Sequence, residues 1–293
     1  MTSLTFTKMQ GLGNDFMVIN AINHPFSLSA KAISALADRH FGIGFDQLLV
    51  VAPAPANSSA IDFSYRIFNA DGGEVSQCGN GARCFARYVR DKGLIDRDEI
   101  HVATASGQLT LYLLENGDVK VNMGVPDFNP EKIPFKAPLR QPAYHLTLPD
   151  HPAPLSIGAV SMGNPHLVYR VADIDSAPVA TLGPALVAHR DFPEGVNVGF
   201  LQVVDAHTLR LRVYERGSGE TLACGSGACA AAVMAQQWGV TSGSCVVQLR
   251  GGQLTIDWAG EGTPVWMSGP ATTVFEGHIN LSDIPILTSE SAQ

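Results

Sequence analysis

The chain has 293 residues, of which 45% are hydrophobic and 16% charged, and its formal net charge is −8. This composition is typical of a globular protein with large cores and excludes a disordered chain. The acidic balance, without any lysine- or arginine-rich run, argues against a nucleic acid or a membrane as partner.

The N-terminus reads MTSLTFTKMQ, which lacks the basic segment and apolar core of a signal peptide. No apolar run reaches the ~18 residues of a membrane-spanning helix. We therefore expect a cytoplasmic protein. In that reducing compartment the five cysteines are not expected to form structural disulfides, and their spacing does not match a zinc site.

In chain order, the first half predicts strands over residues 4–9, 16–20, 48–52 and 61–68, with a helix from Ser29 after the second strand. A second helix is expected to start just after Cys78 and to end at Gly93, since glycine commonly closes a helix.

The second half predicts the same order of elements. Strands are expected over residues 166–171, 199–204 and 208–214, and helices from Thr181 and between Cys224 and Gly239. Serine and threonine are good N-cap residues, so Ser29 and Thr181 are expected to cap the two early helices.

The two halves also match as sequences. The segment RIFNADGGEVSQCGNGARC (66–84) aligns without gaps with RVYERGSGETLACGSGACA (212–230), so that Cys78 meets Cys224. In the same order, GNDFMV echoes GNPHLV, RHFGIGFD echoes RDFPEGVN, and GQLT occurs twice. These matches predict an α+β fold of two pseudo-symmetric domains from an internal duplication, each a mostly antiparallel sheet or barrel around a central helix.

The expected domains are an N-terminal half over 1–124, joined by 272–293 crossing back, and a C-terminal half over 125–271. The proline-rich stretch 125–142 is the expected linker. The helix after each matched cysteine should be the central one, because the second of them is apolar nearly all round. We expect the active site in the cleft between the halves.

The two matched cysteines stand among glycines, directly before a helix start. The helix dipole and the unpaired N–H groups favour a thiolate there, and the glycines let those N–H groups approach a carboxylate- or phosphate-sized anion. One thiolate could remove an α-proton from one face of an amino acid, and the other thiol could protonate the opposite face. The other three cysteines are expected to be buried small hydrophobes: Cys84, Cys229 and Cys245.

With GLGNDF, GFDQ, GNPH and YERGSGET, these segments resemble the diaminopimelate epimerase family from about residue 4 to about residue 280. The resemblance implies an isomerase that converts LL-diaminopimelate to meso-diaminopimelate, for lysine and peptidoglycan synthesis. It implies no cofactor, neither pyridoxal phosphate nor metal. The implied partners are a small-molecule substrate and, in a homodimer, a second copy of the chain.

The resemblance also implies roles for single residues. Cys78 and Cys224 would be the two bases, and His166 and Glu215 would tune them, because a carboxylate raises a thiol pKa and an imidazolium lowers it. A dimer contact is implied at Phe275, a position that is tyrosine in many relatives. The implied substrate contacts are polar or glycine residues: Asn14, Gln47, Asn69, Gly79, Asn80, Asn164, Asn197, Glu215, Arg216, Gly225 and Ser226.

Plainer explanations exist for some of these residues. His166 could be structural and Asn69 a turn residue, while Glu74 and Glu220 fit the positive end of a helix. Three other functions also stay open: a proline or hydroxyproline racemase-epimerase of the same fold, a thiol redox protein, and a non-catalytic binding module. The Glu215–Arg216 dipeptide favours diaminopimelate, because a ring amino acid has no second ammonium–carboxylate end.

Overall fold

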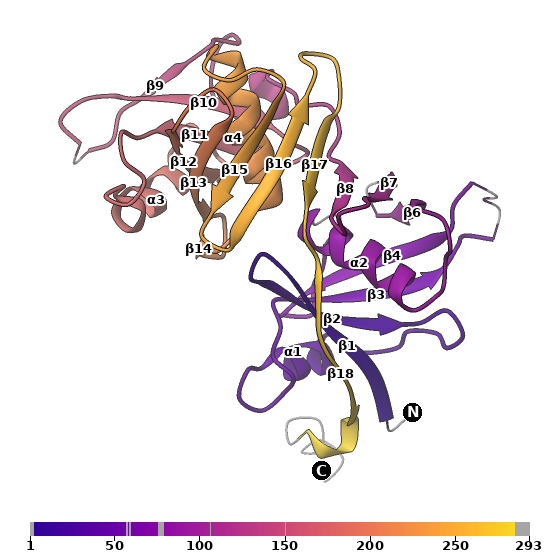
Figure 1. The fold of residues 1–293 in the computed structure, drawn as a ribbon. Coiled ribbons are helices and arrows are strands. Elements are labelled where there is room, and N and C mark those ends of the chain that lie inside the picture. Colours follow the sequence, from indigo (N-terminus) through magenta and orange to yellow (C-terminus); the bar gives the residue numbers. More distant parts are fainter. Residues whose placement is uncertain are drawn as a thin grey trace. The chain divides into compact units, whose positions relative to one another are not determined.

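The computed structural model describes residues 3–56, 58, 60–75, 79–105, 107–149 and 151–284. The chain divides into two compact units (Figure 1). Unit 1 comprises Met1–Val121 and Gly269–Gln293, and unit 2 comprises Asn122–Ser268.

Unit 1 is a mixed sheet with two α-helices, α1 (Ala30–Ala37) and α2 (Gly79–Asp91). Its strands are β1 (Ser3–Gly11), β2 (Asn14–Asn20), β3 (Gln47–Pro53), β4 (Phe63–Asn69), β5 (Glu74–Val75), β6 (Glu99–Thr104), β7 (Gly107–Leu113), β8 (Val119–Asn122) and β18 (Thr272–Asn280). A short 3₁₀-helix, Leu281–Asp283, follows β18.

The sheet of unit 1 is mostly antiparallel, as predicted. Its parallel pairs are β2 with β3 and β4 with β6. The last strand, β18, runs antiparallel beside β1, so the end of the chain completes the sheet that the beginning starts (Figure 1).

Unit 2 repeats this plan with helices α3 (Val179–Val187) and α4 (Gly225–Gln237). Its strands are β9 (Tyr144–Leu146), β10 (Leu155–Ser161), β11 (Pro165–Arg170), β12 (Asn197–Val203), β13 (Thr208–Glu215), β14 (Gly219–Thr221), β15 (Ser244–Leu249), β16 (Gly252–Trp258) and β17 (Val265–Gly269). A 3₁₀-helix, Pro130–Lys132, precedes them.

The two ladders correspond strand by strand, which confirms the duplicated fold. The parallel pairs of unit 2 are β11 with β12 and β13 with β15, in the places of β2 with β3 and β4 with β6. The register corrects one detail of the sequence match. Phe16 pairs with Gln47 and His166 with Asn197, so Asn197 takes the place of Gln47, whereas the sequence alone aligned it with Asp46.

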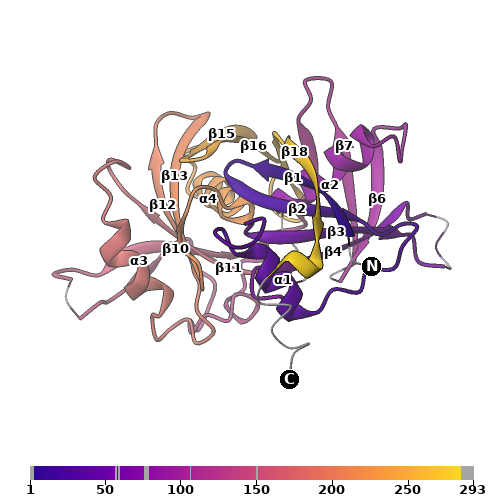
Figure 2. The same cartoon turned by 90° about the horizontal axis from the view of Figure 1, so that it is seen from below.

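The central helices are α2 and α4. Helix α4 packs on strands β10 to β13, β15 and β16, which lie around it in the view of Figure 2. Helix α2 packs on β1, β2, β3, β7 and β18. Both helices end as predicted, with Gly93 and Gly239 at φ 64° and 68°.

The early helices α1 and α3 begin differently. Ser29 caps α1 as predicted, since its Oγ accepts a hydrogen bond from Ala32 N at 3.2 Å. The prediction for Thr181 was wrong, because α3 starts two residues earlier and Pro178 holds the N-cap position. The Thr181 hydroxyl donates back to Pro178 O at 3.1 Å.

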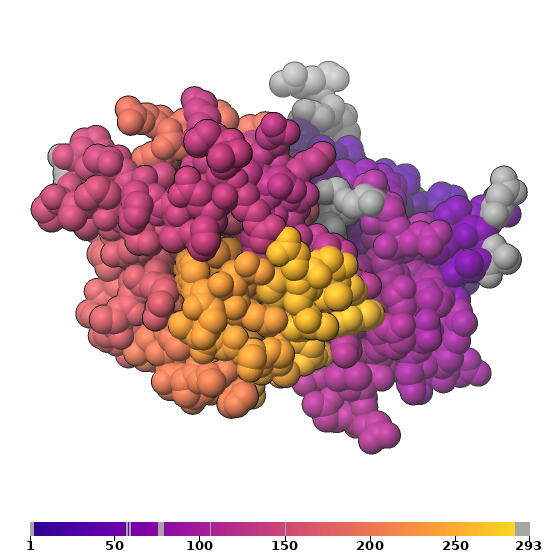
Figure 3. All heavy atoms as spheres, turned by 90° about the horizontal axis from the view of Figure 1, so that it is seen from above, coloured from indigo at the N-terminus to yellow at the C-terminus, as the bar shows by residue number. Residues whose placement is uncertain are grey.

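The stretch 125–142, predicted as the linker at the start of the C-terminal half, is packed as part of unit 2. Ile133 and Phe135 are buried in the core of that unit. Arg140 lies over the Phe128 ring and pairs with Glu261. In Figure 3 the pink surface of this region accordingly adjoins the orange surface near residue 260. Apolar side chains between the prolines, which the linker interpretation ignored, hold the stretch in place.

Candidate active site

Helix α4 begins directly after Cys224, which occupies the N-cap position with an extended backbone (φ −128°, ψ 112°). The residue is 6% exposed. Gly227 explains how the thiol fits there, since a Cβ on this glycine would lie 3.2 Å from Cys224 Cβ and 3.3 Å from its Sγ. Glycine therefore leaves room for a thiol at the start of the helix.

The pKa of Cys224 differs from the sequence prediction, which let the helix N-terminus lower it. Burial and then the Glu215 carboxylate raise the pKa of the thiol well above its ordinary value, against the smaller effects of Gly227 N–H and the Ser226 hydroxyl. Burial dominates because a thiolate here would lose most of its hydration. Cys224 is therefore a neutral thiol, able to donate a proton.

Three polar side chains connect to Cys224 in series. His166 Nε2 lies 3.0 Å from Asn164 Oδ1, and Asn164 Nδ2 donates to Ser226 Oγ at 3.4 Å. Ser226 Oγ in turn lies 3.7 Å from Cys224 Sγ. Because an amide oxygen only accepts, this orientation assigns the hydrogen of His166 to Nε2. This series of contacts fixes the orientation of two predicted substrate contacts, Asn164 and Ser226.

His166 is uncharged at neutral pH. Burial on strand β11 and the nearby Arg216 lower its pKa to about 3. From the sequence, a charged His166 was considered able to lower the thiol pKa. Because His166 is uncharged at neutral pH, it does not have this effect on the thiol. What His166 contributes is a neutral ring that holds Asn164.

Arg216 and Asn197 are held by backbone groups on the same side of unit 2. Asn197 Oδ1 accepts from Arg216 N at 3.0 Å, and Asn197 Nδ2 donates to Pro165 O at 3.3 Å. The Arg216 guanidinium donates to Glu194 O at 2.7 Å and remains exposed. An exposed, anchored guanidinium of this kind can bind a carboxylate.

Unit 1 gathers the matching residues at the start of α2, although Cys78 itself lies outside the described residues. Asn80, on the first turn of α2, is 4% exposed and donates through Nδ2 to Asn14 Oδ1 at 3.3 Å. Gln47 Nε2 donates to Asn69 Oδ1 at 2.9 Å. Asn69 is therefore tied to another predicted contact and is more than a turn residue.

A charged network beside Asn14 was missed from the sequence. Asp15 accepts from Arg39 with both oxygens, at 2.8 and 3.0 Å, and from the buried Lys8 at 2.6 Å. Asp46 accepts from Arg39 at 2.8 Å and from Asn14 Nδ2 at 2.9 Å. The network thus turns the Asn14 amide so that its oxygen faces Asn80. The available signal was that Asp15 and Asp46 directly adjoin the predicted contacts.

The same network lowers the pKa of Asp15. Burial alone would raise the pKa of Asp15, but hydrogen bonds from Arg39 and Lys8 and their positive charges bring it from 3.8 to about 2. Asp15 is therefore ionised through the whole range in which the protein would work.

Glu74 and Glu220 pair with arginines, so their assignment to the helix N-terminus was wrong. Glu74 accepts from both ends of the Arg66 guanidinium, at 2.8 Å each, and Glu220 accepts from Arg212 at 2.8 and 3.0 Å. Both pairs join a long strand to the short strand before the matched cysteine. Bidentate charge-assisted pairing is stronger than a dipole contact.

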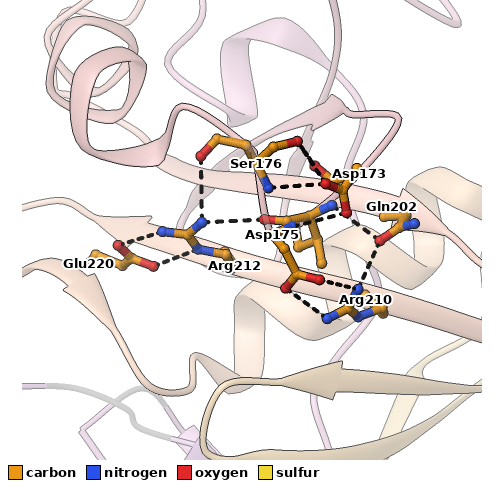
Figure 4. Close-up of polar contacts among 9 residues, drawn as sticks. Asp173, Asp175, Ser176, Gln202, Arg210, Arg212 and Glu220 are labelled. Atoms are coloured by element: carbon orange, nitrogen blue, oxygen red, sulfur yellow. Dashed lines mark hydrogen bonds and ion pairs between the residues drawn. The ribbon is translucent and has the colours of Figure 1, made fainter.

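In unit 2 this pair extends into a larger cluster, shown in Figure 4. Arg210 and Arg212 point from strand β13 toward the loop at 173–177, where Arg210 pairs with Asp175 at 2.9 and 3.0 Å. Arg212 Nη1 donates to the Ile174 and Ala177 carbonyls at 3.3 and 3.4 Å. The cluster anchors the loop before α3. The charged side chains that Figure 4 labels point toward one another.

The other three cysteines are buried, as predicted, and Phe275 is partly exposed. Cys84 and Cys229 lie fully buried inside α2 and α4, and Cys245 is 4% exposed, with burial raising its pKa to about 11. Phe275, on β18, is 47% exposed and meets Phe6 edge-on at 5.9 Å. Within the described residues we find neither a cluster of side chains able to hold a metal ion nor a helix able to span a bilayer.

Solved structures with this fold include a hydroxyproline epimerase and a phenazine biosynthesis protein. A hydroxyproline epimerase from Agrobacterium vitis superposes with a TM-score of 0.69 at 15% identity, covering 97% of this chain and 94% of that one. A PhzF-family phenazine biosynthesis protein from Bacillus anthracis gives a TM-score of 0.67 at 17% identity, covering 95% and 99%. At such identities the likeness confirms the fold alone.

Sequence comparison is more specific. A family profile described as "Diaminopimelate epimerase" matches residues 6–129 and 158–274. Curated diaminopimelate epimerases from Nitrosomonas eutropha, Nitrosospira multiformis and Nitrosomonas europaea are 58%, 55% and 57% identical to the chain, each covering 95% of it and 99% of its own length. Because these matches span both units, the chain belongs to the diaminopimelate epimerase family and is an isomerase.

Proposed function

We propose that this protein interconverts LL- and meso-diaminopimelate, with Cys78 and Cys224 as its two acid–base groups and without a cofactor. The observation that carries the proposal is the placement of Cys224. It is a neutral, buried thiol at the N-terminus of α4, among polar side chains that are typical contacts for an amino acid.

The reacting carboxylate would bind at the backbone N–H groups that begin the two central helices, those of Gly225 and Ser226 and, in the other repeat, those of Gly79 and Asn80. One thiolate accepts the α-proton and becomes a thiol, while the other thiol donates its proton to the opposite face and becomes a thiolate. The two sulfurs thus exchange roles in each turnover, and the configuration at the α-carbon inverts.

The far end of diaminopimelate carries a second ammonium and a second carboxylate. Arg216 would bind the carboxylate, and Glu215 would accept from an ammonium. Asn14, Gln47, Asn69, Asn164 and Asn197 would supply the neutral donors and acceptors. His166 would act on the thiol indirectly, by holding Asn164.

The product would supply lysine and peptidoglycan synthesis in the cytoplasm. We further propose a homodimer in which the exposed Phe275 contributes to the contact. A sedimentation or light-scattering mass of a single chain at micromolar concentration would contradict the dimer.

The test is isotope exchange. LL-diaminopimelate incubated with the enzyme in D₂O should gain α-deuterium as it converts to the meso isomer, followed by mass spectrometry and chiral chromatography. Exchange should survive EDTA and carbonyl reagents, and its loss to either would show a required cofactor.

Two outcomes would overturn the proposal. Exchange with L-proline or trans-4-hydroxy-L-proline but not with diaminopimelate would indicate the ring-amino-acid activity. No exchange with any of them, together with reversible formation of a Cys78–Cys224 disulfide, would indicate a thiol redox protein.

A further inference from the structure

The hairpin that leads to Cys224 places a hydroxyl against Glu215. In the β13–β14 ladder Val213 pairs with Thr221 and Glu215 pairs with Gly219. Paired residues share a face of the sheet, as do residues two apart on a strand, so Thr221 and Glu215 lie on one face. The Thr221 hydroxyl donates to Glu215 Oε1 at 2.5 Å, a short charge-assisted hydrogen bond.

This carboxylate acts directly on the Cys224 thiol. After burial, the charge of this carboxylate is the largest cause that raises the pKa of Cys224. A glutamate carboxylate, at the end of three rotatable bonds, keeps this effect only while the side chain stays directed toward the thiol. Thr221, which is half-buried on the rigid hairpin, limits that freedom.

The first repeat offers a comparison within the same chain. Asn69 stands in the place of Glu215, and Val75 stands in the place of Thr221, with Ile67 pairing Val75 as Val213 pairs Thr221. Valine has no hydroxyl to donate, and there Gln47 donates to Asn69 instead, at 2.9 Å. The hydroxyl thus accompanies the carboxylate: the repeat that carries the acid also carries the donor that fixes it.

We propose that Thr221 is a positioning residue for the reaction, whose hydroxyl fixes the Glu215 carboxylate in the direction that faces the Cys224 thiol. Thr221 does not touch the reacting atoms in this role. It acts through Glu215, on the Cys224 side of the repeat. The role in turnover rests on the proposed epimerase function, but the effect on Cys224 does not.

Other ionisable groups on the elements around α4 act elsewhere. His166 on β11 is uncharged, Glu220 on β14 is ion-paired, and Asp257 on β16 raises the pKa of a different thiol. Glu215 is the charged group that acts on Cys224. A change in the titration of Cys224 on altering Thr221 therefore reports on Glu215.

The experiment measures the rate of Cys224 alkylation by iodoacetamide against pH in the full chain, located by peptide mass spectrometry. Thr221→Val should lower the midpoint by about one pH unit, which corresponds to about tenfold more thiolate below the midpoint. Thr221→Ser keeps a hydroxyl and should restore the wild-type midpoint. A loosened structure would also lower the midpoint, because it would expose the thiol to water, so the double-mutant cycle that follows separates the two causes.

A double-mutant cycle separates positioning from a general structural effect. Glu215→Gln should lower the midpoint at least as far as Thr221→Val, and Thr221→Val should add nothing in the Glu215→Gln background. Thr255→Val is the matched control, since Thr255 is a half-buried strand residue of unit 2, on β16. An unchanged midpoint in Thr221→Val, or a full second shift in the Glu215→Gln background, would overturn the proposal.

The two experiments distinguish a failure of the proposed epimerase function from a failure of the role proposed for Thr221. If the wild-type protein does not epimerise diaminopimelate, that function is wrong, while the alkylation midpoints still decide the role of Thr221. If it does epimerise, Thr221→Val should shift the pH profile of kcat/KM in the same direction as the alkylation midpoint. A wild-type pH profile of kcat/KM in that variant would remove Thr221 from the reaction.

Discussion

The two repeats hold the residues beside their central helices by different means. In unit 1, Asn14 is oriented by a network of charges in which Asp15 binds Lys8 and Arg39. In unit 2, Pro165 follows Asn164 in the place of Asp15, and its carbonyl accepts from Asn197. Neutral side chains and a proline of fixed φ replace the charges.

The two units therefore share one backbone plan, whereas the side chains around their central helices differ. The strand ladders of the two units coincide down to the parallel pairs. Yet Asn69 stands where unit 2 has Glu215, whose carboxylate raises the pKa of Cys224.

The largest expected effect comes from removing one thiol and leaving its match. Cys224→Ala and Cys78→Ala should each lower kcat by about 10²–10⁴-fold or more, because each turnover needs a base and an acid. The measurement is α-deuterium exchange and epimerisation of diaminopimelate under saturating substrate. Full turnover in either variant would show that the two-base mechanism is wrong.

The control for this pair is a cysteine in the same helix. Cys229 is fully buried in α4, one turn beyond the site. Cys229→Ala should cost ~1 kcal/mol of stability through the small cavity and leave kcat within about twofold. A loss of activity equal to that of Cys224→Ala would mean that the helix, and not the thiol, is what the first variant damages.

A medium effect is expected at the network of Lys8, Asp15 and Arg39 in unit 1, where unit 2 has Pro165 in the place of Asp15. The pKa of Asp15 is lowered in the folded protein to about 2, from 3.8. A carboxylate with a lowered folded pKa adds stability above its unfolded pKa, and this is lost as the pH falls through the folded value. The shift corresponds to about 2 kcal/mol.

Asp15→Asn should therefore lower the free energy of unfolding by about 2 kcal/mol near neutral pH, measured by urea denaturation. The difference from wild type should shrink between about pH 5 and about pH 2, where the wild-type carboxylate is protonated. Asp96→Asn, at an exposed position of the same unit, is the control. A difference from wild type that stays constant down to pH 2 would show that ionisation of Asp15 does not matter.

Much of the fold was predictable from the sequence because the repeat doubled every signal. Gly93 and Gly239 each supported the other as a helix end, and Cys78 and Cys224 each supported the other as a helix start. Details without a match in the other half were harder. The stretch 125–142 reads as a linker from its prolines, and only tertiary packing shows that Ile133 and Phe135 enter the core.

The acidity of Cys224 was the feature that sequence reasoning predicted in the wrong direction. A helix start and neighbouring glycines are local signals, and both favour a thiolate. Burial and the approach of Glu215 are tertiary facts, and together they outweigh the local ones. The charged network was missed for the same reason, because Lys8, Asp15 and Arg39 meet only after three segments fold together.

The smallest expected effect compares the first helices of the two repeats. Ser29 and Thr181 are both exposed hydroxyl residues near a helix start, but only Ser29 Oγ accepts from a helix N–H. Ser29→Ala should cost ~1 kcal/mol, because Ala32 N loses its partner at the end of α1. Thr181→Ala should cost at most about 0.5 kcal/mol, since its hydroxyl only donates to the Pro178 carbonyl. Urea denaturation of both variants checks the difference, and equal costs would show that the α1 cap contributes no more than an ordinary surface contact.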